Sequence, residues 1–297
     1  MNPVVLYFAS GDSLYAGAGL LILAVVISRY LKQRRWLRLR NLAAWLGLAL
    51  MVMACPPFSW IVDAIFIAAF VLWLIAANQW LGRPGTAWRS WSAAVLLVVV
   101  LTLTASELPR RRIPAIVGIP SDHLVVIGDS ISSGIDPHVP AWPVVMEKST
   151  SVPVKNLSRP GAQVAEGQDM AGNVARDDRL VLIEIGGNDL LGGEPSVAFE
   201  KNLDATLSKL AMPGRTIVMF ELPLLPHKIA YGQIQRRLAA KYGVWLIPKR
   251  CFVEVIGGAN ATSDGLHLSE SGAHRMAMLV AQVLSPVLKS NMAGTRR

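Results

Sequence analysis

The 297-residue chain is 53% hydrophobic and only 16% charged, whereas soluble domains carry about 25% charged residues, so part of it is not expected to lie in water. Of the formal net charge of +9, residues 1–114 carry +8 and residues 115–297 carry +1. The second half therefore lacks the basic excess that a nucleic-acid-binding domain needs, and nucleic acid is excluded as a partner.

Four apolar segments occupy the first third of the chain, at residues 6–28, 42–58, 60–81 and 91–105. Each approaches the roughly 20 residues that a helix needs to cross a membrane. Buried helices of a soluble core are the alternative, but the segments are nearly free of charge and have tryptophans near several of their ends. The first segment is too long for a cleavable signal peptide, and no basic residue precedes it. We expect residues 1–106 to form an all-α transmembrane region of about four helices.

The basic residues of the loops predict how this region is oriented. Eight of them fall in the first and third loops: Arg29, Lys32, Arg34, Arg35, Arg38, Arg40, Arg83 and Arg89. Three more, Arg110–Arg112, fall on the opposite side. Because basic loops stay in the cytoplasm, the majority places both termini outside it. This predicts an integral, multi-pass protein of a bacterial-type inner membrane, with residues 107–120 as a linker to a periplasmic domain.

Residues 121–297 have a different pattern. Short apolar runs, at residues 124–127, 154–157, 180–185, 216–220 and 244–247, alternate with amphipathic stretches such as 197–210 and 233–242. Apolar strands that alternate with helices are typical of a parallel sheet covered on both faces. We therefore expect an α/β domain with a three-layer arrangement around a central parallel sheet.

Polar motifs follow three of the predicted strands directly, where active sites form in open parallel sheets. Gly128, Asp129 and Ser130 follow the first strand, and a serine at such a turn can expose its hydroxyl beside backbone N–H groups. Taken alone, these residues are better explained as a helix cap. The second glycine of the G-x-S-x-G turn is missing, which argues against the α/β-hydrolase type.

Glycine and asparagine residues follow the next two strands. Gly161 could point its N–H into the cleft, and the amide of Asn188, in the run Gly186–Asp189, could donate to an oxyanion. Each is also compatible with an ordinary turn.

An Asp-Gly-Leu-His run at residues 264–267 precedes the last helical stretch. At this spacing the carboxylate of Asp264 can orient the imidazole of His267, whose other nitrogen can accept a serine proton. A lone Asp-x-x-His is weak, but the four motifs in this order are what a Ser-His-Asp site with an oxyanion hole requires.

The four motifs together resemble those of the SGNH (GDSL-type) hydrolases over residues 120–290. The resemblance implies a flavodoxin-like three-layer fold and assigns Ser130, His267 and Asp264 as the catalytic triad. It also implies an oxyanion hole made by the N–H groups of Ser130 and Gly161 and the side chain of Asn188. Within the family, the domain looks most like the compact thioesterase and lysophospholipase-type esterases.

These observations lead to the hypothesis of a membrane-anchored serine esterase that acts through a covalent acyl-enzyme. An acyl ester of a lipid or of an acylated envelope glycan is the expected substrate, with membrane lipid as the surroundings. No cofactor or metal is expected, since Cys55 and Cys251 are too few for a cysteine zinc site and the other histidines lack ligand spacing. An acyltransferase of the same chemistry and a non-catalytic envelope binding module are the alternatives.

Overall fold

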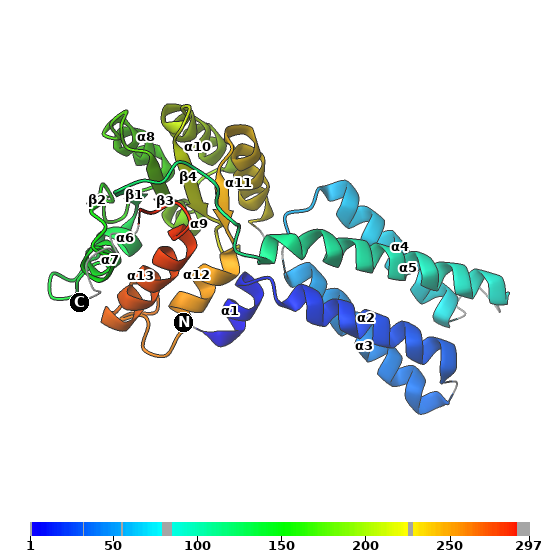
Figure 1. The fold of residues 1–297 in the computed structure, drawn as a ribbon. Coiled ribbons are helices and arrows are strands. Elements are labelled where there is room, and N and C mark those ends of the chain that lie inside the picture. The colour runs from blue at the N-terminus through cyan, green and yellow to red at the C-terminus, as the bar shows by residue number, and fades with distance from the viewer. Residues whose placement is uncertain (1, 32, 55, 79–84, 225–227, 290–297) are drawn as a thin grey trace, which may run out of the picture. The chain divides into compact units, whose positions relative to one another are not determined.

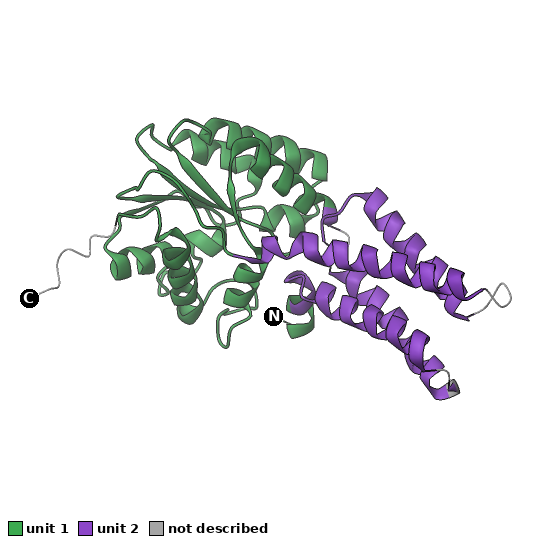
Figure 2. Ribbon diagram, turned by 45° about the vertical axis from the view of Figure 1, so that its right-hand side comes forward, with its two compact units in different colours: residues 1–6, 113–224, 230–297 green, residues 7–112, 225–229 purple. Residues whose placement is uncertain are grey.

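Figure 1 shows the computed structural model of the chain, which describes residues 2–31, 33–54, 56–78, 85–224 and 228–289. The chain divides into two compact units, coloured separately in Figure 2. Unit 1 comprises Met1–Leu6, Ile113–Leu224 and Ala230–Arg297, and unit 2 comprises Tyr7–Arg112 and Leu225–Ile229.

A parallel sheet of five strands, in the order β2-β1-β3-β4-β5, forms the centre of unit 1. Its strands are β1 (Leu124–Gly128), β2 (Val154–Asn156), β3 (Leu180–Glu184), β4 (Thr216–Phe220) and β5 (Trp245–Ile247). Each lies within one residue of its predicted bounds. The chain runs from β1 outward to β2 and then returns to the other side of β1 as β3, so the strand order reverses between β1 and β3. Ligands of such sheets bind at this switch point, beyond the carboxyl ends of the strands.

Helices cover both faces of the sheet, which confirms the predicted three-layer α/β fold (Figure 1). Leu124, Val126 and Leu182 belong to a buried apolar core with residues of the helices on one face. These helices are α7 (Trp142–Thr150), α12 (Lys249–Ile256) and α13 (Glu270–Leu284). The other face carries α8 (Val164–Gly172), α10 (Ser196–Leu210) and α11 (Ile229–Tyr242).

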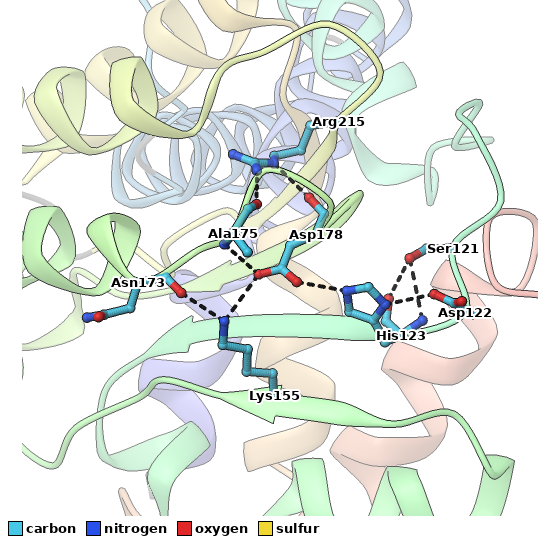
Figure 3. A network of polar contacts seen from close by, with 8 residues as sticks. All are labelled: Ser121, Asp122, His123, Lys155, Asn173, Ala175, Asp178 and Arg215. Atoms are coloured by element: carbon cyan, nitrogen blue, oxygen red, sulfur yellow. Dashed lines mark hydrogen bonds and ion pairs between the residues drawn. The ribbon is translucent and has the colours of Figure 1, made fainter.

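A polar network ties together the amino-terminal ends of four strands, opposite the switch point (Figure 3). Asp178, before β3, contacts His123 Nε2 at 2.9 Å and Lys155 Nζ at 3.3 Å, and its carbonyl accepts from Arg215 Nε at 2.8 Å. His123 Nδ1 also meets Asp122 at 2.7 Å. Burial lowers the pKa of His123, but the contacts with the two aspartates outweigh it and raise that pKa above its ordinary value.

Unit 2 contains four long helices, as the sequence predicts: α2 (Ser13–Tyr30), α3 (Arg34–Met53), α4 (Trp60–Asn78) and α5 (Thr86–Glu107). A short helix, α1 (Pro3–Ala9), precedes them, and a 3-10 turn, η1 (Pro109–Arg111), follows them. Within the described residues, three stretches are long and apolar enough to cross a membrane: Ser13–Tyr30, Trp60–Asn78 and Thr86–Arg111. The remaining helix, α3, has arginines at positions 34, 35, 38 and 40, near its start, and these lower its mean hydropathy.

The first apolar segment differs from its prediction, because it is two helices rather than one continuous span. Gly11 adopts a positive φ of 80°, and the N–H of Asp12 bonds to the Ser10 hydroxyl. A left-handed glycine ends one helix, and a hydroxyl that takes up the next N–H allows a new helix to begin.

Two glycines set the close approach of α2 and α3. A Cβ on Gly17 would lie 2.7 Å from the carbonyl oxygen of Gly47, and a Cβ on Gly47 would lie 2.8 Å from the carbonyl oxygen of Gly17. No side chain fits at these distances, so the two backbones touch directly. Small residues at such crossings are a common way for apolar helices to associate where no water drives them together.

We predict opposite effects for alanine at two glycines of α2. Gly17→Ala should destabilise the helix pair by about 1–3 kcal/mol, because the methyl group overpacks the crossing. Gly19→Ala should be neutral or stabilise by up to about 1 kcal/mol, since nothing lies within 4 Å of its Cβ position and alanine favours helix. Thermal unfolding of the full chain in detergent, followed by far-UV circular dichroism, measures both. Equal effects of the two variants would contradict the glycine contact.

Candidate active site

Ser130 lies directly beyond β1, at the start of the short helix α6 (Ser130–Ser133). Asp129 caps this helix: its Oδ1 accepts the N–H of Ile131 at 2.9 Å. Gly128 admits no side chain, because a Cβ there would lie 2.7 Å from the Ser132 side chain and 2.9 Å from the Glu184 carbonyl oxygen. This glycine therefore allows β1 and β3 to lie close together where the serine emerges.

Asn188 belongs to α9 (Gly187–Gly192), which follows β3, and its amide reaches toward the other two strand ends. Its Nδ2 donates to the Ala162 carbonyl at 2.9 Å and lies 3.4 Å from Asp129 Oδ2. Gly161, in the turn after β2, has a φ of 74°, and a Cβ on it would meet no atom within 4 Å. The residues predicted after β1, β2 and β3 therefore come together at one edge of the sheet.

The loop before α13 holds His267 and Asp264 as an oriented pair. His267 Nδ1 lies 2.6 Å from Asp264 Oδ2. Asp264 Oδ1 accepts the backbone N–H groups of Leu266 at 2.9 Å and His267 at 2.8 Å. The hydrogen bond with His267, followed by these backbone bonds, holds the pKa of Asp264 far below its ordinary value, so the carboxylate is ionised.

Ser130 and His267 line the same pocket, which brings residues 137 positions apart along the chain to one site. Its remaining lining is mainly apolar: Ile131, Gly134, Ile135, Asp136, Val139, Pro140, Ala141, Trp142, Leu268 and Ala273. The cavity measures about 10 Å³, room for about one water molecule. Within the described structure no hydrogen bond joins the Ser130 hydroxyl to His267, and such contacts often tighten only when substrate binds.

Buried carboxyl groups beneath the pocket are a feature that the sequence analysis missed. Glu184, the last residue of β3, is 6% exposed, and its Oε2 accepts the Ser132 hydroxyl at 2.8 Å. The same hydroxyl accepts Trp142 Nε1 at 3.1 Å. An acidic residue within the apolar run 180–185 was the signal available in the sequence. The three side chains form a polar bridge from β3 through α6 to the wall of the pocket.

Burial shifts the charge state of these acids. It raises the pKa of Glu184 well above its ordinary value, with nearby Asp129 adding to the shift. Burial also raises the pKa of Asp129 to about 6, although the Ile131 N–H and His267 pull it down. Asp189 is shifted upward too, mainly by burial, and its Oδ2 accepts the Val164 N–H at 3.0 Å. Glu184 therefore keeps its proton to a higher pH than an exposed glutamate does, because a lone charge at this depth is costly.

A family profile matches the part of the chain that holds this site. The GDSL-like Lipase/Acylhydrolase family matches residues 126–275, a stretch that contains Ser130, Gly161, Asn188, Asp264 and His267. The chain belongs to this family. It is an ester-cleaving hydrolase, and the resemblance inferred from its motifs is confirmed.

Curated relatives are similar over nearly their whole length. "Esterase TesA" of Pseudomonas aeruginosa is 28% identical over 182 residues, which are 56% of this chain and 89% of the relative. An arylesterase of Vibrio mimicus is 29% identical over 180 residues, covering 55% of this chain and 88% of its own. "Thioesterase 1/protease 1/lysophospholipase L1" of Escherichia coli is 26% identical over 208 residues, or 67% and 94% of the two chains. A crystal structure of TesA aligns at 27% identity and a TM-score of 0.48, over 56% of this chain and 99% of that one.

The raised pKa of Glu184 leads to a prediction about stability and pH. The folded state keeps a proton on Glu184 that the unfolded chain releases above about pH 4.3, so wild-type stability falls as pH rises from there. Glu184→Gln keeps the acceptor for Ser132 without this titration. Its melting temperature should exceed that of the wild type by a margin that widens as the pH rises above about 4.3, the pKa of glutamate in the unfolded chain.

Glu221→Gln provides the matched control, since Glu221 is also buried, at 4% exposed. Its Oε1 pairs with Arg236 Nε at 2.7 Å, so the amide should destabilise the fold instead. If Glu184→Gln lowers stability as much as Glu221→Gln does, Glu184 is charged in the fold and the assignment is wrong.

Proposed function

We propose that the chain is a membrane-anchored serine esterase in which Ser130, His267 and Asp264 form the catalytic triad. The single observation that carries the proposal is the bond of 2.6 Å between His267 and Asp264, in a histidine that shares its pocket with Ser130. The carboxylate takes Nδ1, which leaves Nε2 of the imidazole free to act as the base.

The reaction would proceed through a covalent intermediate. The Ser130 hydroxyl attacks the acyl carbonyl carbon while its proton passes to His267 Nε2. The tetrahedral intermediate collapses, the C–O bond to the alcohol breaks, and the imidazolium gives its proton to the leaving oxygen. Water, deprotonated by the same imidazole, then attacks the acyl-enzyme and releases the acid and free Ser130.

The oxyanion of the tetrahedral intermediate would be held by the N–H groups of Ser130 and Gly161 and by the Asn188 amide. The positive φ of Gly161 and the Asn188 bond to the Ala162 carbonyl support this assignment, because both fix donors before substrate arrives. The second Asn188 proton faces Asp129 at a weak distance of 3.4 Å, so an oxyanion can take it over at little cost.

The apolar helices would serve as the anchor, with residues 1–106 in the membrane, 107–120 as a linker and 121–297 as the hydrolase domain. The three apolar stretches support this division, and the loop arginines support a periplasmic hydrolase domain in a bacterial-type inner membrane. An enzyme held at that surface would meet acyl esters of lipids or of acylated envelope glycans. A hydrolysis screen from acetyl to palmitoyl esters distinguishes these substrate classes by chain length.

Substitutions in the triad should differ in severity. Ser130→Ala and His267→Ala should each abolish ester hydrolysis, and the double variant should be no worse than either one, because the two groups act in a single step. Asp264→Ala should be milder, since the carboxylate takes no proton itself. A fluorophosphonate probe should label the wild type but neither Ser130→Ala nor, at neutral pH, His267→Ala. Full esterase activity in purified Ser130→Ala would refute the proposed nucleophile.

The oxyanion hole makes a separate kinetic prediction. Asn188→Ala should lower kcat by about 10²–10³-fold, the typical contribution of one fixed donor. KM should change less, because the bond strengthens only as negative charge develops on the oxygen. Asn173→Ala is a control of the same chemistry. Asn173 lies beyond the end of α8, its amide donates to the nearby Asp169 carbonyl, and kcat should stay unchanged. A normal kcat in Asn188→Ala would leave Asn188 as a turn residue only.

The proposed orientation is tested by reporter fusions after residue 297. Alkaline phosphatase, which is active only outside the cytoplasm, should be active there, and a cytoplasmic reporter should be silent. The reverse pattern would place the hydrolase domain inside the cell.

A further inference from the structure

Charge is distributed unevenly along the helices of unit 2. Residues 13–62 and 64–106 contain no Asp or Glu. The arginines gather where α2 ends and where α3 and α5 begin: Arg29, Arg35, Arg38, Arg40 and Arg89 are the described ones. Asp63 and Glu107 lie at the opposite ends of α4 and α5, so within the described residues neither Arg29 nor Arg89 pairs with a carboxylate.

A cavity of about 610 Å³ lies between the end of α2 and the start of α5. Its polar lining comes from Ser28, Arg29, Arg89 and Ser90, and Arg29 Nη1 donates to the Ser90 hydroxyl at 3.1 Å. The remaining walls are mostly apolar: Val25, Val26, Ala93, Ala94 and Leu97, with Tyr30 and Thr86 at the polar end. Two guanidinium groups above an apolar slot suit a ligand with an anionic head and a hydrocarbon tail.

A third arginine at this end of the helices, Arg40, uses its donors in hydrogen bonds within the protein. Arg40 is 2% exposed, its Nη1 donates to the Ala77 carbonyl at 2.8 Å, and its other nitrogens donate to Asn41 and Asn78. It adds positive potential near Arg89 without offering a donor to a ligand. The free donors at the cavity therefore come from Arg29 and Arg89.

Exposed aromatic residues lie on the helices next to the two arginines of the cavity. Tyr30, Trp88 and Trp91 are 75%, 48% and 71% exposed, and each lies within two residues of Arg29 or Arg89 in the sequence. Exposed tryptophan and tyrosine gather at the depth of the lipid headgroups in membrane proteins. In a membrane, the two arginines would thus lie at phosphate depth and the apolar walls would extend toward the hydrocarbon.

We propose that this cavity binds an anionic glycerophospholipid, with its phosphate between Arg29 and Arg89 and an acyl chain along the apolar walls. The inference rests on the proposed membrane placement of unit 2. Basic pockets between membrane helices bind anionic headgroups in this way, and the proposed orientation puts the cavity in the cytoplasmic leaflet, whose surface is negative. Inorganic phosphate would leave the apolar walls unfilled, and a choline headgroup would bring a cation beside two guanidinium groups.

Binding is measured by native mass spectrometry of the full chain released from detergent micelles. The probes are dioctanoyl phosphatidylglycerol, dioctanoyl phosphatidylcholine and inorganic phosphate. The wild type should bind phosphatidylglycerol at least roughly tenfold more tightly than phosphatidylcholine, as expected for two charge-assisted bonds, and phosphate should not compete. Equal affinity for the two lipids, or displacement by phosphate at similar concentrations, would overturn the proposal.

Two double variants separate the cavity from general attraction to a basic surface. Arg29→Gln with Arg89→Gln should remove the preference for phosphatidylglycerol. Arg35→Gln with Arg38→Gln removes the same charge from exposed residues at the same end and should keep the preference within about twofold. Equal losses in both would show a diffuse charge effect and defeat the inference. Arg29→Lys with Arg89→Lys, which keeps the charge, should retain binding and rules out misfolding as the cause.

Extraction of membranes with alkaline carbonate distinguishes this inference from the function on which it rests. If the wild-type chain leaves the membrane, the proposed anchor fails and the lipid site fails with it. If the chain stays in the membrane but shows no preference for phosphatidylglycerol, only the lipid site is refuted.

Discussion

The direct contact of β1 with β3 is the constraint on which the rest of the hydrolase domain depends. Gly128 has no side chain, so its strand can lie against the Glu184 carbonyl, and the Asp129 N–H bonds to that carbonyl at 3.2 Å. The contact brings the turn after β1 next to the turn after β3, where Asn188 faces Asp129. It also draws carboxyl groups into a space with little water, which is why burial raises the pKa values of Asp129 and Glu184. The same contact thus positions the proposed nucleophile and raises the pKa values of the two buried carboxyl groups near it.

The sequence predicts the sheet well because each strand is defined locally. The run 216–220 is apolar after Thr216, and its bounds match β4 residue for residue. The site residues are also predictable, because strand ends of a parallel sheet must meet at one edge. The close pairing of Asp264 with His267 follows from their spacing of three residues, and it is present in the structure.

What the sequence does not predict depends on contacts between distant residues. The bridge from Glu184 through Ser132 to Trp142 joins three elements, and none of these residues shows a partner in its own neighbourhood of the chain. The break at Gly11 was missed because the apolar run continues across it, while one backbone angle decides that the helix ends. Hydropathy depends on composition alone, so it does not report the positive φ of one glycine.

In the helical unit, the arrangement of arginines has two consequences that support each other. The basic residues that predict a cytoplasmic end for α2, α3 and α5 are the same residues that leave two guanidinium groups without carboxylate partners. Arg40 differs from them, because its guanidinium donates to the Ala77 carbonyl of α4 and to the Asn41 amide oxygen of α3. Arg40 is thus satisfied by contacts within the helices, whereas Arg29 and Arg89 keep donors that the proposed lipid headgroup would take up.

Backbone hydrogen bonds join the segment before β1 to the segment after α13. The Ser121 N–H bonds to the Val287 carbonyl and the Lys289 N–H bonds to the Ser121 carbonyl, both at 2.8 Å. These two bonds lie at the amino-terminal edge of the sheet, whereas Ser130 lies beyond the carboxyl end of β1. Because Ser121 lies next to Val287 and Lys289, the segments that enter and leave the sheet domain are close together. Such a domain tolerates fusion to a new carrier, or circular permutation, without disturbance of its reactive face. Such a layout suits a hydrolase domain that follows a set of apolar helices in this chain and matches its relatives over most of their own length.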